Sequence, residues 1–192
     1  VHFNRNKPFI AFLSHTDGKP LEKLAVSSQK QADEIVADLA GASYRVQAIE
    51  KKEVKRKPPP PFTTSTLQQA ASQRYGFSAR QTMRLAQQLY ETGLITYMRT
   101  DSLNLSADAL SAAHSFIHKA YGPSYSLEHA RVYKTKSKGA QEAHEAIRPT
   151  DVTRTPADTK QRLDKQQHTL YELIWQRFMA TQMPEAVFDA TS

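Results

Sequence analysis

Four consecutive prolines, Pro58 to Pro61, are the feature that most constrains how this chain can fold. Proline has no backbone N–H for a sheet and holds φ near −65°, so the run favours a stiff, extended connection. The basic stretch 51–57 leads directly into it. We therefore place a domain boundary between residues 57 and 58. The basic stretch can be a solvated strand end or a phosphate contact, and the pattern leaves both open.

The chain before the prolines has the pattern of half of a small α/β domain. Residues 9–13 form a short apolar run typical of a strand, followed by a turn at 17–20. From Ser28 apolar residues recur with helical spacing as far as Gly41. Alternation over 44–50 then predicts a second strand.

The chain after the prolines is predicted to be mostly helical. A first helix, capped by Ser65 or Thr66, is expected to end at Gly76. A second helix, capped by Ser78, is expected to end at Gly93. Its inward positions are Met83, Ala86, Leu89 and Tyr90. Because only two or three residues join these helices, the pair has the form of a helix-turn-helix.

The residues that follow complete an α+β, mainly helical fold class. Residues 94–97 resemble a strand, and helix, tight turn, helix, strand is the order of a winged-helix module. Further helices are predicted over 106–122 and 167–182, and a strand-like tail over 186–192. Three large apolar residues of the last helix fit a buried face better than a base-stacking surface: Trp175, Phe178 and Met179.

Charge and composition narrow the class of partner. Lys and Arg outnumber Asp and Glu by 26 to 19, which gives a net charge of +7 and a pI near 9.6. Such a balance suits a polyanion such as nucleic acid, although a solubilising surface has the same signature. The absence of cysteine excludes disulfides and thiolate sites. No long apolar run indicates a membrane span, and a start at Val1 suggests a piece of a longer cytoplasmic chain.

The first segment with chemical potential is Gly93 to Ser102, which contains Tyr97, Arg99 and Asp101. If it is extended, these three side chains share one face, about 6.6 Å apart along the strand. A phenol is a poor nucleophile at neutral pH. A fixed guanidinium favours the ionised form of the phenol and can bind a phosphate in a bidentate manner. Tyr97 can therefore attack a phosphodiester. A tyrosine that packs across a strand is the more ordinary reading of the same pattern.

The second segment is residues 141–151, preceded by basic residues that include Lys136 and Lys138. If 141–147 is a short helix, His144 and Arg148 lie one turn apart and can hold one phosphate together. His144 and Glu145 match the first two residues of the zinc-binding pattern HExxH. Arg148 occupies the position of the second histidine, so no metal site is expected. An ordinary half-buried histidine remains the alternative.

Three segments together resemble the type IA DNA topoisomerase family, of which bacterial DNA topoisomerase I is a member. Residues 95–102, Ile-Thr-Tyr-Met-Arg-Thr-Asp-Ser, resemble the family's active-site tyrosine segment. Residues 61–71 resemble the start of its tyrosine domain, and residues 141–149 resemble its histidine motif. The three occur in the family's order.

The resemblance implies a role for each matching residue. Tyr97 would form a 5′-phosphotyrosine link, Arg99 would hold the scissile phosphate, and His144 would position it or stabilise its charge. Second-shell or DNA contacts are implied for five more residues: Thr96, Asp101, Arg148, Lys136 and Lys138. The implied reaction relaxes negatively supercoiled DNA by single-strand cleavage, strand passage and religation without ATP.

The resemblance also implies a division of the chain and a missing partner. Residues 1–57 would be the first segment of a β-rich arch domain, 58–184 the tyrosine domain, and 185–192 the return into the arch, with the prolines at the hinge. The family binds Mg²⁺ through an acidic DxDxE-type cluster in an N-terminal domain, and this chain contains no DxD. We therefore expect no metal in these 192 residues and no relaxation by them alone.

Two other functions fit parts of the pattern. A winged-helix module that binds DNA without chemistry explains the charge and the helix order. A protein-interaction scaffold explains the globular composition. Phosphate-driven binding weakens steeply with salt, which separates the scaffold from the other two.

Overall fold

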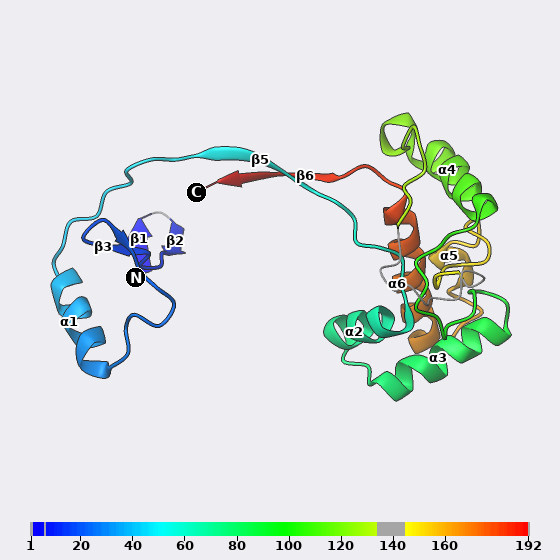
Figure 1. Cartoon of the computed structure of the whole chain (residues 1–192), viewed down its shortest axis with the longest axis horizontal. Helices are drawn as coiled ribbons and strands as arrows, with labels where there is room; N and C mark the ends of the chain where they lie inside the picture. The colour runs from blue at the N-terminus through cyan, green and yellow to red at the C-terminus, as the bar shows by residue number, and fades with distance from the viewer. Residues whose placement is uncertain (1, 6, 134–144, 192) are drawn as a thin grey trace. The chain divides into compact units, whose positions relative to one another are not determined.

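The computed structural model describes residues 2–5, 7–133 and 145–191 and forms two compact units, Val1–Glu50 and Lys51–Ser192 (Figure 1). Both contain helices and short strands, and the described strands form three two-stranded antiparallel sheets. The mixed, mainly helical fold class is confirmed at this level. The boundary between the units precedes the predicted one because the basic stretch forms a strand of the second unit.

The first unit contains two small hairpins and one helix: β1 (His2–Arg5), β2 (Lys7–Ile10), β3 (His15–Thr16), β4 (Lys19–Pro20) and α1 (Gln29–Leu39). The helix predicted from Ser28 is present, and Ser28 is its cap, accepting a hydrogen bond from the Gln31 amide at 3.3 Å. The strand predicted over 44–50 is wrong, because residues 42–50 have no regular secondary structure. Alternation alone was insufficient there, since no partner strand pairs with the segment and Val46 stays 69% exposed.

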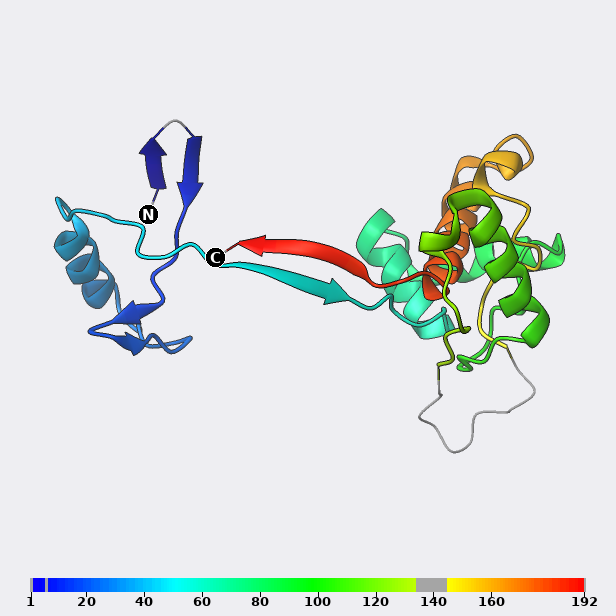
Figure 2. The same ribbon diagram turned by 90° about the horizontal axis from the view of Figure 1, so that it is seen from above.

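The second unit begins and ends in an antiparallel ribbon of β5 (Lys51–Arg56) and β6 (Ala186–Thr191), which Figure 2 shows side by side. Lys51 pairs with Thr191 and Arg56 pairs with Ala186. The predicted strand-like tail is thereby confirmed, and the basic stretch forms the partner strand.

The body of the second unit consists of helices: α2 (Thr64–Tyr75), α3 (Ala79–Glu91), α4 (Ala107–Tyr121), the 3-10 turn η1 (Pro123–Tyr125), α5 (Pro156–Thr159) and α6 (Lys165–Thr181). Ser78 and Ser106 cap α3 and α4 as predicted. The cap of α2 is Thr63, one turn earlier than expected. Thr66 completes that cap, because its hydroxyl accepts from the Thr63 amide at 2.9 Å.

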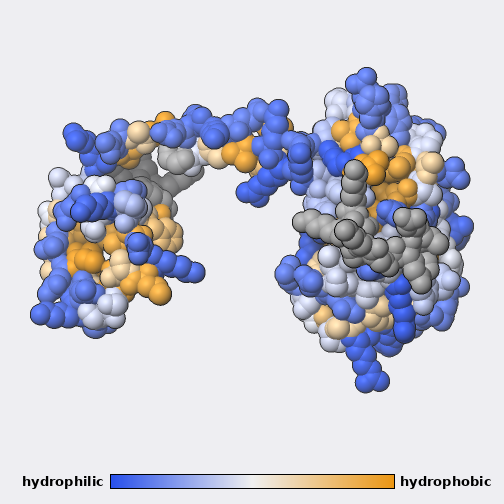
Figure 3. All heavy atoms as spheres, viewed as in Figure 1, coloured by the Kyte–Doolittle hydropathy of each residue, from blue (hydrophilic) through white to orange (hydrophobic). Residues whose placement is uncertain are grey.

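Helix α6 is the centre of this body, with α2, α3 and α5 packed against it. It buries residues on most of its circumference, as a helix surrounded by others does. Trp175, Phe178 and Met179 are 7%, 1% and 2% exposed, which confirms the packing interpretation. Trp175 also donates from Nε1 to the Val152 carbonyl at 3.0 Å. Outside this core, the visible surface of the unit is largely hydrophilic (Figure 3).

The proline run is fastened to the helical body. The Tyr133 hydroxyl donates to the Pro58 carbonyl and Arg177 Nη1 to the Pro60 carbonyl, both at 3.2 Å. The Arg177 guanidinium also lies 4.2 Å from the centre of the Phe62 ring. These contacts hold the end of the ribbon against the body, at the place where the sequence predicted a bending hinge.

The strand predicted at 94–97 is not formed as a strand. Ile95 makes an isolated bridge to Pro149, and the described residues around it add no ladder. The helix-turn-helix of α2 and α3 is present without that strand. None of the helices in the described residues is both long enough and apolar enough to cross a membrane.

Candidate functional site

The candidate site is built on residues 94–102, here called the tyrosine segment, which follows α3. Gly93 ends the turn after α3 with φ of 70°, a left-handed conformation that glycine adopts without strain. The Leu94 amide donates to the Leu89 carbonyl at 2.9 Å. The segment is then fixed by Ile95 and Met98, whose side chains are each 1% exposed.

The first helical residue of α2 holds one side of the tyrosine segment. The Thr64 hydroxyl donates to the Met98 carbonyl at 2.7 Å and accepts from the Thr100 amide at 3.0 Å. The Thr64 amide donates to the Thr100 carbonyl at 2.9 Å. One threonine therefore fixes the backbone on both sides of position 99.

The chain at 146–150 holds the other side. The Thr96 hydroxyl donates to the Ala146 carbonyl at 2.7 Å and accepts from the Arg148 amide at 3.0 Å. The Thr96 amide donates to the Arg148 carbonyl at 2.9 Å, and the Thr150 amide donates to the Leu94 carbonyl at 3.1 Å. Thr96 therefore supports the backbone next to Tyr97 from inside the fold.

Side chains of the tyrosine segment alternate in exposure although it is not a strand. Tyr97, Arg99 and Asp101 are exposed, and Tyr97 is 44% exposed. The residues between and after them are buried: Met98, Thr100 and Ser102. The phenol, guanidinium and carboxylate thus share one exposure class, as expected for an extended segment, and the structure shows that their side faces solvent; Thr96 is only half-buried, unlike Met98 and Thr100.

Tyr97 has one aromatic neighbour and a free hydroxyl. Its ring meets that of Tyr90 edge to face, with centroids 5.3 Å apart. Across the described residues, its hydroxyl makes no hydrogen bond, and neither Arg99 nor Asp101 makes an ion pair. The prediction that Tyr90 faces the core is wrong, because Tyr90 is 40% exposed on the flank of α3.

Arg148 is held by protein groups close to this segment. Its Nη2 lies 2.6 Å from Glu145 Oε2 and 3.4 Å from Ser106 Oγ, and Nη1 donates to the Pro149 carbonyl at 3.0 Å. The short helix predicted over 141–147 is wrong for residues 145–147, which are extended with a bridge from Ile147 to Phe62. The helical argument for a joint grip by His144 and Arg148 therefore does not apply to the described part.

Glu145 joins this contact to the start of α4. Its Oε1 accepts from the Ser106 amide at 2.6 Å, at the cap of the helix. Burial raises the pKa of the Glu145 carboxyl, but hydrogen bonds from Arg148 and Ser106 outweigh that effect and hold it below the usual range. The charged form of Glu145 thus stabilises the fold beside the tyrosine segment.

Several predicted site residues lie outside the described residues: His144, Lys136 and Lys138. Their roles stay predictions. Within the described ranges, no three of the residues His, Cys, Asp and Glu gather closely enough to hold a metal ion.

A cavity of about 670 Å³ lies between α4 and residues 148–153, and it is distinct from the tyrosine segment. Phe116, Val152 and alanines of α4 supply its apolar wall, and Lys119 and Arg148 are among its polar residues. Tyr97 and Arg99 do not line it. Tyr97 is instead exposed at the surface of the unit, at 44%.

Sequence reasoning missed three residues that shape the site: Thr64, Tyr90 and Glu145. Thr64 follows the true cap of α2, a signal hidden by the other hydroxyl residues around it. Tyr90 lies on the side of α3 next to Gly93, and its helical spacing suggested burial. Glu145 was considered only as part of a metal motif, whereas the structure pairs it with Arg148.

Comparison with known proteins gives a consistent match over almost the whole chain. A family profile described as DNA topoisomerase matches residues 4–192. The DNA topoisomerase 1 of Rickettsia felis is 46% identical over 194 aligned residues, which cover 97% of this chain and 25% of that protein. The DNA topoisomerase 1 of Campylobacter jejuni is 47% identical, over 94% of this chain and 27% of that protein.

A solved structure agrees with the sequence matches. The full-length topoisomerase I of Thermotoga maritima superposes with a TM-score of 0.68 and 38% identity, covering 82% of this chain and 26% of that chain. The chain thus spans about a quarter of the length of the relatives it matches.

Proposed function

The chain belongs to the bacterial DNA topoisomerase I family, and on that premise we propose that it carries the strand-cleaving half of a type IA active site. The observation that carries this proposal is the exposed Tyr97 phenol, which has no hydrogen-bond partner among the described residues and sits on a backbone held from both sides. A nucleophile needs both access and a fixed position.

In the proposed reaction, Tyr97 Oη attacks the phosphorus of a backbone phosphodiester. The new bond joins Oη to phosphorus, and the bond from phosphorus to the 3′ oxygen of the neighbouring nucleotide breaks. The phenolic proton leaves to solvent or a nearby base, and the released 3′ oxygen takes up a proton from solvent or a nearby acid. One DNA end stays on the protein as a 5′-phosphotyrosine and the other is a free 3′-hydroxyl. Because the phosphodiester energy is kept in the new bond, religation by the 3′-hydroxyl needs no ATP.

Arg99 is the residue of this chain suited to the charge that develops on the phosphate. It is exposed, it follows Tyr97 by two positions, and no carboxylate among the described residues neutralises it. A guanidinium that is free of protein partners can hold two phosphate oxygens at once. Following the family motif, we propose that His144 contacts the same phosphate and that Asp101 has a supporting role at the site.

The metal half of the site would come from another part of the whole protein. We propose that Mg²⁺ bound there supplies further neutralisation of the DNA phosphates, and that this chain alone neither relaxes supercoils nor cleaves efficiently. The whole protein would act on DNA in the bacterial cytoplasm, where it would relax negative supercoils by passing one strand through the break in another.

The test uses a full-length family member that carries these 192 residues. A single-stranded oligonucleotide is labelled at its 3′ end or at its 5′ end, and the reaction is stopped with denaturant. The expected covalent adduct retains the 3′ label and releases the 5′ label, and it disappears in Tyr97→Phe. An adduct that survives Tyr97→Phe would show that another residue is the nucleophile.

The alternative function is DNA binding without chemistry, favoured by the helix-turn-helix of α2 and α3 and by the basic charge. The same experiment separates the two functions. A pure binding module gives no adduct with either label while its complex with DNA still forms.

A further inference from the structure

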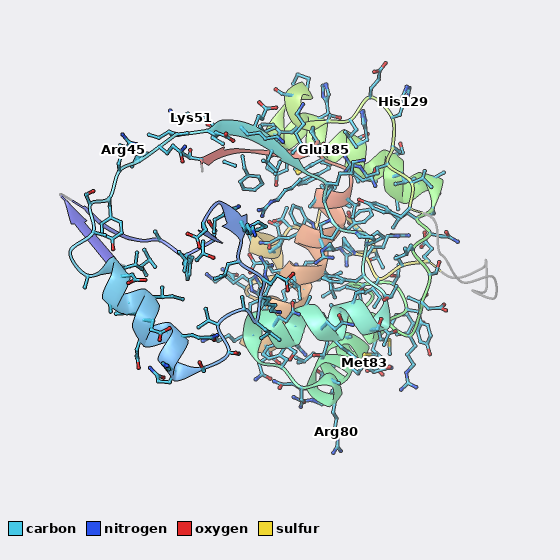
Figure 4. The ribbon with its side chains drawn as sticks, turned by 60° about the vertical axis from the view of Figure 1, so that its left-hand side comes forward. Arg45, Lys51, Arg80, Met83, His129 and Glu185 are labelled. Carbon is cyan, nitrogen blue, oxygen red and sulfur yellow. The ribbon has the colours of Figure 1, made fainter. Side chains whose placement is uncertain are left out.

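The outer face of α3 carries two exposed arginines, Arg80 and Arg84, which are here called the arginine row. They are four residues apart and therefore lie on the same side of the helix, one above the other. Figure 4 shows Arg80 pointing away from the body of the unit into solvent. Across the described residues, neither side chain makes a hydrogen bond or an ion pair.

The chain around the arginine row lacks acidic residues. No Asp or Glu occurs between Glu53 and Glu91, a stretch that contains all of α2 and nearly all of α3. Exposed residues of α2 and α3 in this stretch are instead basic or neutral hydrogen-bonding side chains, among them Gln69, Gln73 and Arg74. The surface from α2 through the first three turns of α3 is therefore positive, and the nearest acid along α3 is Glu91, which lies on the face of the arginine row about 10 Å along the axis from Arg84.

Both arginines are placed where they disfavour the helix. Arg80 is the second residue of α3, next to the positive end of the helix dipole, and the first turn contains no acid. Like charges at positions i and i+4 also repel each other. A basic surface selected only for solubility has no reason to take these positions, whereas an anionic ligand would remove both penalties at once.

Helix α3 leads directly to the nucleophile. Tyr90 near its end contacts the Tyr97 ring, at 5.3 Å between centroids. At about 1.5 Å and about 100° per helical residue, Arg84 and Arg80 lie about 9 Å and 15 Å along the axis from Tyr90 and roughly a quarter to a third of a turn around the helix from it.

From these observations we propose that the arginine row binds phosphates of the DNA strand that Tyr97 cuts, so that α3 is a track for the strand next to the cleavage site. The inference rests on the proposed function, and it adds a binding surface outside the tyrosine segment. Arginine suits this role because its fork of donors matches a phosphate and needs no base identity.

The experiment measures binding of the unaltered chain and two variants to a fluorescent single-stranded oligonucleotide across a range of salt concentrations. The test variant is Arg80→Gln with Arg84→Gln. The matched control is Lys160→Gln with Arg162→Gln, which removes two exposed positive charges from the same unit. Both variants lower the net charge from +7 by two, to +5, so they differ only in where the charge is lost.

The test variant should lose two phosphate contacts. The slope of log affinity against log salt is then expected to become shallower by about 1.4, because each single-strand phosphate contact contributes about 0.7. Between 50 and 200 mM salt the affinity gap between the unaltered chain and the test variant should narrow about sevenfold. The control should keep the slope of the unaltered chain.

A second readout separates binding from folding. Urea unfolding followed by Trp175 fluorescence should give the test variant a midpoint equal to or above that of the unaltered chain, since two unfavourable charges are removed from α3. A lower midpoint would mean that the arginines support the fold, and it would overturn the inference.

The remaining outcomes are decisive as well. If the test variant has the same slope as the control, or if the unaltered chain shows no salt-dependent binding, the proposal that the arginine row binds DNA is overturned. Neither result bears on the chemistry of Tyr97. A shallower slope together with an adduct that persists in Tyr97→Phe refutes the proposed nucleophile, and with it the statement that the track leads to the cut strand.

Discussion

Replacing Thr96 with valine tests whether Tyr97, the proposed nucleophile, is held from the inside of the fold. The substitution keeps the shape of the side chain but removes a hydroxyl that donates to the Ala146 carbonyl at 2.7 Å and accepts from the Arg148 amide at 3.0 Å. Ala146 is fully buried, so water does not replace the lost donor easily. At about 1 kcal/mol for each net hydrogen bond, the free energy of unfolding should fall by about 2 kcal/mol.

Urea unfolding followed by the fluorescence of Trp175 measures this change. Trp175 is the chain's one tryptophan and lies buried in α6, so its signal reports the helical unit and not residues 1–50. Thr96→Ser is the matched control, because it keeps the hydroxyl and loses one methyl group, at a cost below about 1 kcal/mol. If Thr96→Val unfolds within about 0.5 kcal/mol of the unaltered chain, or if Thr96→Ser loses as much as Thr96→Val, the hydroxyl does not fix the tyrosine segment and the reasoning is refuted.

Three further perturbations test other contacts of the site. Thr64→Val should also lower the free energy of unfolding by about 2 kcal/mol, measured by the same urea assay, with Thr64→Ser as its control. Glu145→Gln should lower the free energy of unfolding by about 1–3 kcal/mol at neutral pH. Because folding lowers the pKa of Glu145, the charged carboxyl stabilises the unaltered chain above a pH of about 4.3, and this stabilisation is lost as pH falls through the lower folded pKa. The urea midpoints of the unaltered chain and the variant should therefore converge between pH 6 and pH 3. Parallel curves would contradict the assigned ion pair. Tyr90→Ala should reduce the rate of adduct formation in the full-length protein more than Tyr90→Phe does, because the edge-to-face contact with Tyr97 needs a ring; equal rates for both variants would show that Tyr90 does not position the nucleophile.

Local signals in the sequence were sufficient to predict that α1, α2, α3, α4 and α6 are helices. Ser78 and Ser106 cap α3 and α4 as predicted, and α1 follows Ser28, where its pattern begins, because a cap and its helix are set by neighbouring residues. Simple alternation along an extended chain also predicted that Tyr97 and Arg99 share one side of the segment, although it did not say that this side is exposed. The family resemblance, which the comparisons confirm, came from motif residues of the same kind.

Contacts between distant parts of the chain could not be read in this way. The tyrosine segment is fixed by Thr64, 34 and 36 residues away from its partners, and by the chain around Ala146, 50 residues from Thr96. These hydrogen bonds replace the strand ladder that the sequence predicted at 94–97. The strand predicted at residues 44–50 is absent for a related reason. An alternating segment forms a strand only beside a partner strand, and the described residues provide none.

The most direct test of the central claim is to identify the amino acid that carries the DNA. The denatured adduct of a full-length protein containing this chain is digested with nuclease and protease, and the peptides are sequenced by mass spectrometry. The account predicts a nucleotide linked through its 5′ phosphate to Tyr97 and to none of the other seven of the chain's eight tyrosines. A nucleotide on a different residue, or one linked through a 3′ phosphate, would contradict it.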